Sequence, residues 1–340
     1  MRYFLRLAIA AIVLSTANTL FSQQPTILHG QVTTDGQGLG PVLNAAKKAT
    51  SVTWIGYSVP VVSKFSNGWR SNDIEYLEGT NSEETQSDDN RKTFDHANIL
   101  IRVADGAITK IRVSEPDRQL DAGGAHFIWL NTVNPDDSVR ILTDLARQDD
   151  PRRVRDNAVF AISIHQTNSA TAALVSLADP TNDLALRDKA AFWLANQRGA
   201  EGLAAIKQFA HNDSDPKFRE KLTFDLTLSK DPSALDEIIR MAHEDSSPQV
   251  RKQAQFWMAN KGGKKVSDDL RTIATNDPNE QIRKSAVFAL SRLPGDEAAN
   301  QLIAVADSSK DPVVRRQAIF WLGQSNDPRA LDYLTKLLKQ

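Results

Sequence analysis

The stretch DPVVRRQAIFWL, residues 311–322, is the last copy of a pattern that recurs every 32 residues through the second part of the chain. One slot of the pattern is always arginine: Arg155, Arg187, Arg219, Arg251, Arg283 and Arg315. The slot five residues later is always phenylalanine: Phe160, Phe192, Phe224, Phe256, Phe288 and Phe320. A fixed period of this length predicts a solenoid, in which each unit packs on its neighbours.

Each unit is expected to hold two helices, which we call helix A and helix B. In helix A the residues one before, three after and seven after the arginine are mostly apolar or small, and they share one helical stripe. Helix B has an apolar pair three residues apart, such as Leu302 and Val305. Asp-Pro pairs predict helix starts, with aspartate as the N-cap, at Asp215, Asp231, Asp311 and Asp327.

The apolar pair of helix B occurs seven times, which predicts about seven helix pairs over residues 121–340. The first helix A would then cover Gly123–Asn131, which keeps Trp129 in register but has Gly123 in the arginine slot. A terminal repeat is expected to be atypical because it contacts a different neighbour. We expect Gly123-Gly124 to form the joint with the preceding domain.

The motif DPVVRRQAIFWLGQSNDPRAL, residues 311–331, resembles HEAT repeats of the short, bilin-lyase-like type. The resemblance covers roughly residues 121–340 and implies an α-solenoid. In that family the function is most often protein binding and scaffolding, while a few members are enzymes. With the features of the N-terminal region, the whole chain also resembles exported bacterial HEAT-repeat proteins.

Residues 23–120 predict a small β-rich domain, so the fold class is α+β. Ser51–Val62 is a strand candidate, and two further β-rich runs flank Asp105-Gly106, which is typical of a tight hairpin. A short helix is expected near Pro41–Ala49, and Trp54 and Trp69 are expected in the core. The acidic segment Asn81–Lys92 indicates a solvated loop; calcium binding is an alternative, although the spacing is not that of an EF-hand.

Residues 1–22 have the form of a secretory signal peptide, with Arg2 and Arg6 before a short apolar run. Cleavage would follow Ala17 or Ser22, and an uncleaved anchor is the alternative. We therefore expect an exported protein, periplasmic or secreted, with no integral membrane segment after cleavage. The oligomeric state stays open.

The composition bounds the chemistry of the 340 residues. The chain has no cysteine, which excludes disulfides, thiolate catalysis and cysteine-ligated metals. The net charge of −1 gives no general attraction for nucleic acid. The six histidines form no H-E-x-x-H pair, only one His-Glu dipeptide is present, and no phosphate-binding loop, dinucleotide fingerprint or G-x-S-x-G motif occurs. We expect no enzyme activity and no cofactor.

The arginine ladder has two interpretations. Each arginine could bond aspartates and carbonyls of the adjacent loops and so tie one repeat to the next. The alternative is a track for anions, which would need unpaired cations and fits poorly with the near-neutral charge. We favour the structural interpretation.

The slot six residues after the arginine alternates between large and small side chains: Trp129, Ala161, Trp193, Asp225, Trp257, Ala289 and Trp321. Large beside small is how packed layers interdigitate, so the tryptophans are expected in the core. Asp225 stands in this otherwise apolar series and should need a partner, such as an indole N–H or an arginine. A catalytic role for Asp225 is the alternative.

The phenylalanine slot lies far from the centre of the apolar stripe on helix A. The six rings could be wedged between successive A helices, or they could form an exposed stripe for a peptide or an amphipathic helix. The leading functional hypothesis is therefore an exported, non-enzymatic scaffold whose A-helix face binds a protein or peptide partner. The alternatives are an enzyme or accessory subunit with its site in the β-rich domain or near Asp121–His126, and a purely structural spacer.

Overall fold

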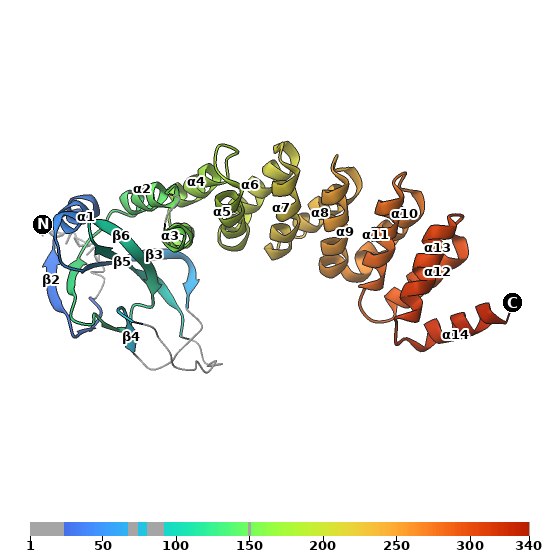
Figure 1. Ribbon diagram of the computed structural model, residues 1–340, viewed down its shortest axis with the longest axis horizontal. Helices are drawn as coiled ribbons and strands as arrows, with labels where there is room; N and C mark the ends of the chain where they lie inside the picture. The colour runs from blue at the N-terminus through green and yellow to red at the C-terminus, as the bar shows by residue number, and fades with distance from the viewer. Residues whose placement is uncertain (1–23, 67–73, 80–91, 149–150, 340) are drawn as a thin grey trace, which may run out of the picture.

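A computed structural model describes residues 24–66, 74–79, 92–148 and 151–339. A β-rich region at the N-terminal end is followed by a long row of helices that ends at the C-terminus (Figure 1). The expected signal peptide, Trp69 and all of the expected acidic loop except Lys92 lie outside the described residues. In the part of the chain that is described, no helix is both long and apolar enough to cross a membrane.

The β-rich region contains a five-stranded sheet and a three-stranded sheet. The larger sheet has the order β2-β8-β3-β5-β6, and the smaller has the order β1-β7-β4. The strands are β1 (Ile27–Leu28), β2 (Gln31–Asp35), β3 (Thr53–Phe65), β4 (Ile74–Tyr76), β5 (Phe94–Ala104), β6 (Ala107–Ser114), β7 (Gln119–Asp121) and β8 (His126–Leu130). One helix, α1 (Leu39–Lys48), follows β2.

The hairpin predicted at Asp105-Gly106 is confirmed. Strands β5 and β6 are antiparallel, with Ala104 opposite Ala107 across the turn. Both turn residues have positive φ, 51° for Asp105 and 75° for Gly106. This is the backbone conformation that an Asp-Gly pair supplies at low cost and that matches the twist of the strands.

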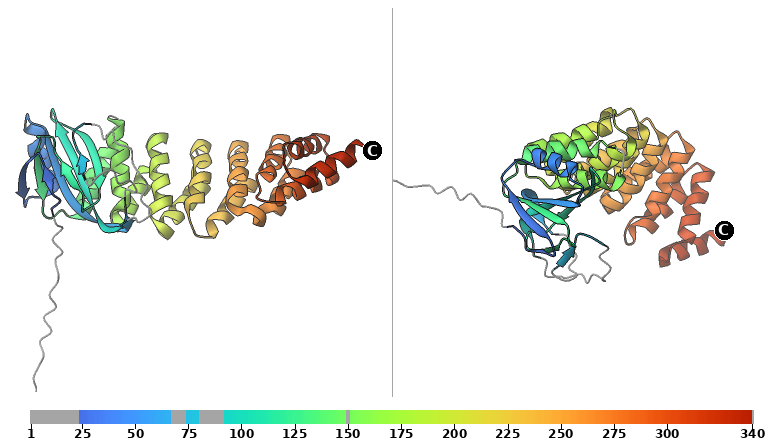
Figure 2. Two further views of the ribbon diagram at one scale, coloured as in Figure 1. Left: turned by 90° about the horizontal axis from the view of Figure 1, so that it is seen from below. Right: turned by 60° about the vertical axis from the view of Figure 1, so that its left-hand side comes forward.

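The helical array alternates two sets of helices. The A helices are α3 (Arg152–Ile164), α5 (Leu184–Gln197), α7 (Pro216–Leu228), α9 (Pro248–Gly262), α11 (Glu280–Ser291) and α13 (Pro312–Gly323). The B helices are α2 (Pro135–Ala146), α4 (Asn168–Leu177), α6 (Gly199–Asn212), α8 (Ser233–Glu244), α10 (Ser267–Asn276), α12 (Glu297–Ser308) and α14 (Pro328–Leu338). Each A helix packs on the next A helix and on the B helices beside it, as expected for a solenoid (Figures 1 and 2).

The predicted stripe of helix A forms the core of the array. In the repeat of α9 its members Val250, Ala254 and Met258 are all fully buried. The small residue at the centre lets neighbouring helices approach closely. Three of the four aspartates expected as N-caps, Asp215, Asp311 and Asp327, each accept a hydrogen bond from a backbone N–H of the first turn. Such a cap contributes about 1 kcal/mol to helix stability. The fourth prediction, Asp231, is one residue off, because the N-cap of α8 is Pro232.

The predicted first A helix, Gly123–Asn131, is wrong. Residues 126–130 form strand β8, which pairs in parallel with both β2 and β3. The side chains alternate: Phe127 and Trp129 join the core between the two sheets, whereas Leu130 joins the core shared with the helices. A period of two is that of a strand, so the match of Trp129 to the helical register is a coincidence.

The Gly123-Gly124 pair is consequently not the joint between the two regions. It turns the chain from β7 into β8, and both glycines have positive φ. The β-rich region therefore extends ten residues beyond the expected boundary, to Leu130, and the array begins with helix α2.

The joint is a shared core with a buried polar network. One face of the larger sheet, α1, α2 and α3 contribute to the same hydrophobic cluster, which continues through the array. At its centre, Ser138 Oγ lies 2.8 Å from Tyr57 Oη and 3.0 Å from His165 Nε2. His165 Nδ1 lies 2.7 Å from the carbonyl oxygen of Ala161. Burial lowers the pKa of His165 to about 4, so the ring is neutral at neutral pH.

Candidate partner-binding face

The arginine ladder ties one repeat to the next. Arg219 donates to both carboxylate oxygens of Asp245, with Nε–Oδ2 at 2.8 Å and Nη2–Oδ1 at 2.9 Å. Arg155 pairs in the same way with Asp183, and Arg187 donates to Asp213. The aspartate belongs to the next repeat in every case, so an ion pair ties each of these repeats to the next, and the pairs made by Arg155 and Arg219 are bidentate.

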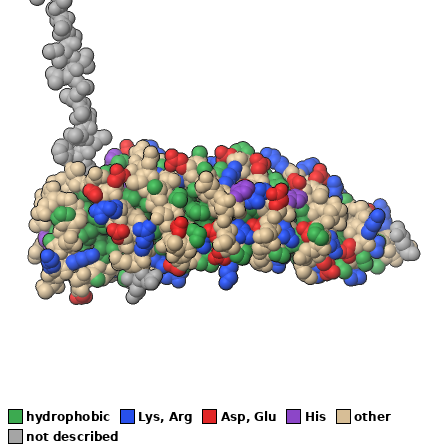
Figure 3. Space-filling view, turned by 90° about the horizontal axis from the view of Figure 1, so that it is seen from above, with side chains coloured by type: hydrophobic (Ala, Val, Ile, Leu, Met, Phe, Trp, Pro, Cys, Tyr) green, Lys and Arg blue, Asp and Glu red, His purple; other side chains and the backbone are tan. Residues whose placement is uncertain are grey.

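The rest of the ladder follows the same arrangement. Arg283 donates to Asp311, and Arg251 lies 3.9 Å from Asp277 while it donates to the carbonyl of Asp245. Arg315, in the last A helix, is exposed. Five guanidinium groups thus have acidic partners, and basic and acidic side chains are mixed along the face drawn in Figure 3. This arrangement supports the structural interpretation over an anion track.

The phenylalanine ladder is neither fully wedged between the A helices nor fully exposed as a stripe. Phe224 and Phe320 are exposed, at 37% and 53% of their surface. Phe160, Phe192, Phe256 and Phe288 are half-buried. The rings are thus wedged against neighbours on one side and remain open to solvent on the other.

The neighbours are mostly the tryptophans of the next A helix. Phe160 lies 4.7 Å from Trp193, Phe224 lies 4.9 Å from Trp257, and Phe288 lies 5.1 Å from Trp321, measured between ring centroids. Between α9 and α11, where the next slot holds Ala289, Phe256 instead stacks on Phe288 at 6.3 Å. We call this series of rings the aromatic ladder; it runs along the A helices.

The tryptophans of the array, which were expected in the core, pack against it at its edge. Trp193, Trp257 and Trp321 are half-buried, whereas Ala161 and Ala289 are fully buried. The slot lies at the edge of the apolar stripe, where a small side chain is covered and an indole extends toward the surface. The Nε1 atoms of the three indoles are buried without a hydrogen-bond partner in the described part of the chain.

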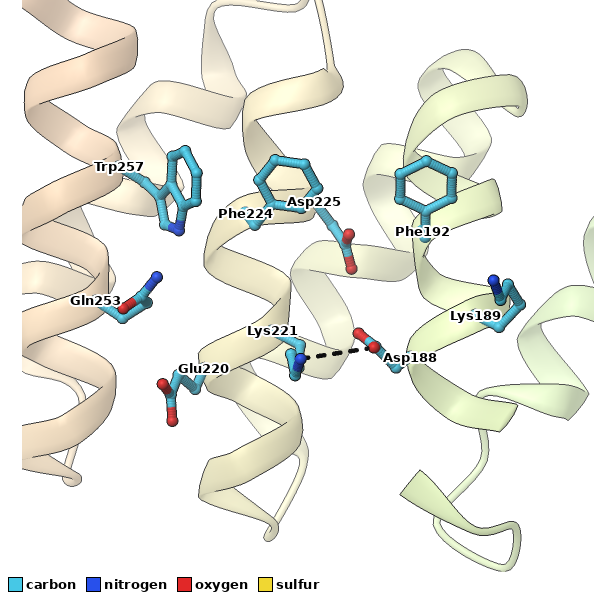
Figure 4. A pocket seen from close by; sticks show the side chains of 9 residues that line it. All are labelled: Asp188, Lys189, Phe192, Glu220, Lys221, Phe224, Asp225, Gln253 and Trp257. Carbon is cyan, nitrogen blue, oxygen red and sulfur yellow. Dashed lines mark ion pairs between the residues drawn. The ribbon is translucent and has the colours of Figure 1, made fainter. Parts of the chain in front are cut away.

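The aromatic ladder is interrupted between α5 and α7. There the slot that would hold a tryptophan for Phe192 holds Asp225 instead. The interruption coincides with a cavity of about 480 Å³, lined by Phe192, Phe224 and Trp257 around the aspartate. Figure 4 shows the Asp225 carboxylate between the rings of Phe224 and Phe192, directed from α7 toward α5. We call this cavity the α7 slot.

Asp225 has neither of the partners expected for it. The residue is only 2% exposed, and its Oδ2 atom has no hydrogen-bond partner among the described residues. Burial raises its pKa well above the ordinary value; Asp188 adds to the rise, and Lys221 opposes it. Lys221 instead pairs with Asp188, Nζ–Oδ2 3.8 Å (Figure 4). An unpartnered buried carboxyl group is costly, so a site that keeps one needs an explanation.

A second cavity, of about 590 Å³, lies in the β-rich region beside the expected alternative site at Asp121–His126. His29 Nδ1 lies 2.9 Å from Asp121 Oδ2, and this hydrogen bond lowers the pKa of Asp121. His126 Nε2 lies 3.1 Å from Thr33 Oγ1. The acid and the hydroxyl contact different histidines, so these groups do not form one catalytic relay.

Metal ligation gains no support from the described residues, among which no group of three His, Asp or Glu side chains could hold an ion. The one His-Glu dipeptide lies at the end of α8, where His243 Nε2 is 3.8 Å from Asp269.

Comparisons with known proteins agree with this architecture. Residues 267–340 match the family model of HEAT repeats. The array is a HEAT-like solenoid. No curated protein matches the chain.

Several solved structures are similar to part of this chain at low identity. Human deoxyhypusine hydroxylase is 17% identical, over 59% of this chain and 90% of that chain, with a TM-score of 0.33. The complex of CpcE and CpcF of phycocyanin lyase from Nostoc is 16% identical, over 56% and 77%, with a TM-score of 0.31. Kap121p is 14% identical, over 60% of this chain and 27% of that chain, with a TM-score of 0.40.

The cavity at the α7 slot was not predicted from the sequence. The exception at Asp225 was visible, but its surroundings come from three helices: α5, α7 and α9. The detectable signal was the pairing of two neighbouring slots, because each phenylalanine packs on the tryptophan slot of the following repeat.

Proposed function

We propose that the protein is an exported, non-enzymatic scaffold that binds a protein or peptide partner along the A-helix face of its solenoid. The single observation that supports this most is the aromatic ladder, in which half-exposed rings follow one another across successive helices. A row of partly exposed aromatic rings is rare on a surface that contacts only water, and it is typical of partner-binding surfaces. Export rests on the signal-like residues 1–22.

The geometry also determines which rings can be tested. Phe256 and Phe288 stack on each other, so their removal would disturb packing as well as binding. Phe224 and Phe320 expose more of their rings, so their removal separates the two effects better. A matched control is the pair Leu331 and Leu338 on α14, which are exposed hydrophobic residues away from the aromatic ladder.

The experiment is crosslinking in the producing cell, followed by identification of the captured protein. We expect the wild type and Leu331→Ser/Leu338→Ser to capture the same partner. We expect Phe224→Ser/Phe320→Ser to lose it while the protein stays folded at the assay temperature, with a melting temperature lowered only by the lost contacts to Trp257 and Trp321. Capture of the same partner by all three proteins would contradict the proposal and would place binding on the β-rich region or on the B helices.

A further inference from the structure

The α7 slot has the shape of a missing ring. Beside Phe160, Phe224 and Phe288 an indole of the next A helix fills the space, at centroid distances of 4.7–5.1 Å. Beside Phe192 that position is taken by a carboxyl group, and the space around it remains open. A ligand that completes the ladder must therefore be flat and must stack on aromatic faces.

The charges around the α7 slot also favour a positively charged ligand. The Asp225 carboxyl group is nearly fully buried, has no hydrogen-bond partner at Oδ2, and points into the cavity. The electrostatic influence of Asp188 reaches it from α5, and Lys221 is drawn toward Asp188. A cation that enters would remove the unfavourable interaction between the two acids and would satisfy the buried oxygen.

One common side chain combines both properties. The guanidinium group of arginine is planar, stays charged at all ordinary pH values, stacks on aromatic rings and donates several hydrogen bonds to a carboxylate. Lysine supplies the charge without the plane, and a neutral aromatic ring supplies the plane without the charge.

We infer that the α7 slot is a subsite for one arginine side chain of the partner, with the guanidinium group in the place of the missing indole and hydrogen-bonded to Asp225. The subsite deepens the proposed function and rests on it, because the arginine belongs to the chain that lies along the aromatic ladder. Asp188 adds a second carboxylate to the subsite, while Phe192 and Phe224 provide the stacking faces.

The charges around the slot predict how binding depends on pH. Those that line it are Asp188 and Lys189 from α5 and Glu220 and Lys221 from α7; α9 contributes Gln253, which is neutral. Because the pKa of Asp225 is raised in the empty slot, the carboxyl group must lose its proton when a guanidinium group binds. Affinity should therefore rise with pH through that pKa and then level off.

The test uses the full chain and the peptide acetyl-Gly-Arg-Gly-amide, followed by calorimetry and by the indole N–H signal of Trp257 in NMR spectra. We expect the arginine peptide to bind at millimolar concentration and to shift that signal. The same peptide with citrulline, which is flat but neutral, and the same peptide with lysine should each bind about tenfold more weakly or worse.

Two variants test the carboxylate. Asp225→Asn removes the charge at nearly constant shape, and Asp225→Trp fills the slot with the side chain of the neighbouring repeats; both should lose at least about tenfold in affinity. Asp332→Asn makes the same change of charge at an exposed position on α14 and should bind as the wild type does.

Equal binding of the citrulline peptide, equal binding of the lysine peptide, or undiminished affinity of Asp225→Asn would each overturn the inference. The titration of the wild type at several pH values needs no variant, so misfolding of a variant does not leave the inference untested. The peptide assay requires no natural partner, so its failure and the failure of the crosslinking experiment are distinct results.

Discussion

Asp245 and Asp225 are both buried carboxyl groups of the same solenoid, and the structure treats them in opposite ways. Asp245 receives two hydrogen bonds from Arg219 of the preceding repeat. Burial alone would raise its pKa, but the hydrogen bonds from Arg219 and from the Ser247 backbone outweigh burial and lower it. Asp225 is buried but lacks such hydrogen bonds, and its pKa is raised. The buried acid with a partner from its own chain holds repeats together, whereas the one without a partner is the group that we propose binds a ligand.

The largest expected effect concerns Asp245, the buried acid that is paired with an arginine. Arg219→Met should leave the Asp245 carboxylate buried without its ion-pair partner, which lowers the free energy of unfolding by about 3–5 kcal/mol. Urea denaturation measures the change. Arg315→Met is the matched control, because Arg315 occupies the same slot but is exposed, and it should change stability by less than about 0.5 kcal/mol. Equal effects of the two substitutions would refute a structural role for the ladder.

A buried base at the joint extends the comparison. The folded-state pKa of His165, about 4, lies below its value in an unfolded chain, so between the two values the unfolded chain binds more protons than the folded state. The stability is complete above about pH 6.5 and is lost as pH decreases toward 4, by about 2–4 kcal/mol. Unfolding measured from pH 7 to pH 4 should show this loss, and His165→Asn should show a smaller one. Parallel curves for the two proteins would exclude His165 as the cause.

The tryptophans test the filled part of the aromatic ladder. Trp257 is half-buried and contacts Phe224 and Phe256, so Trp257→Ala should cost about 2 kcal/mol, less than the roughly 3–5 kcal/mol of a fully buried ring. Thermal unfolding measures it, with Leu338→Ala as an exposed control. A cost below about 0.5 kcal/mol would show that the rings contribute little to the array.

The smallest expected effect concerns Asp225, the buried acid without a partner. A raised folded-state pKa gives Asp225 a stabilising contribution that is complete below the pKa of an unfolded chain and is lost as pH rises through the folded-state pKa. The free energy of unfolding of Asp225→Asn should therefore increase relative to that of the wild type as pH rises, by up to about 1 kcal/mol near neutrality. Asp332→Asn, compared by the same denaturation curves, should show no such trend. A stability difference that shrinks with rising pH would mean that Asp225 has a hidden partner.

The repeat architecture was predictable from the sequence because each slot of helix A has one dominant requirement. Where helices approach, five of the six A helices have an alanine, as at Ala254 and Ala318, and Leu222 of α7 is the exception. The hairpin was predictable because positive φ at Asp105 and Gly106 restricts the choice of residue. These are local constraints, so one chain segment contains the whole signal.

Other features depend on contacts between segments. Trp129 fits the helical register by number, yet its neighbours on β2 and β3 make the segment a strand. The α7 slot forms because Phe192 of one repeat faces Asp225 of the next, and these residues lie on two different helices. The sequence marked Asp225 as exceptional, but the open space beside it follows only from how the rings pack.

The shared core at the joint has a consequence for how the molecule comes apart. The sheet covers the first helices α2 and α3, and thus serves as a lid on the hydrophobic end of the stack. At the opposite end, α14 buries only Ala330, while Leu331 and Leu338 are 67% and 89% exposed. Because each repeat is held mainly by its nearest neighbours, fraying should start at α14 and travel toward the sheet. Amide protons should therefore exchange in a gradient along the chain, fastest in α14 and slowest in α3.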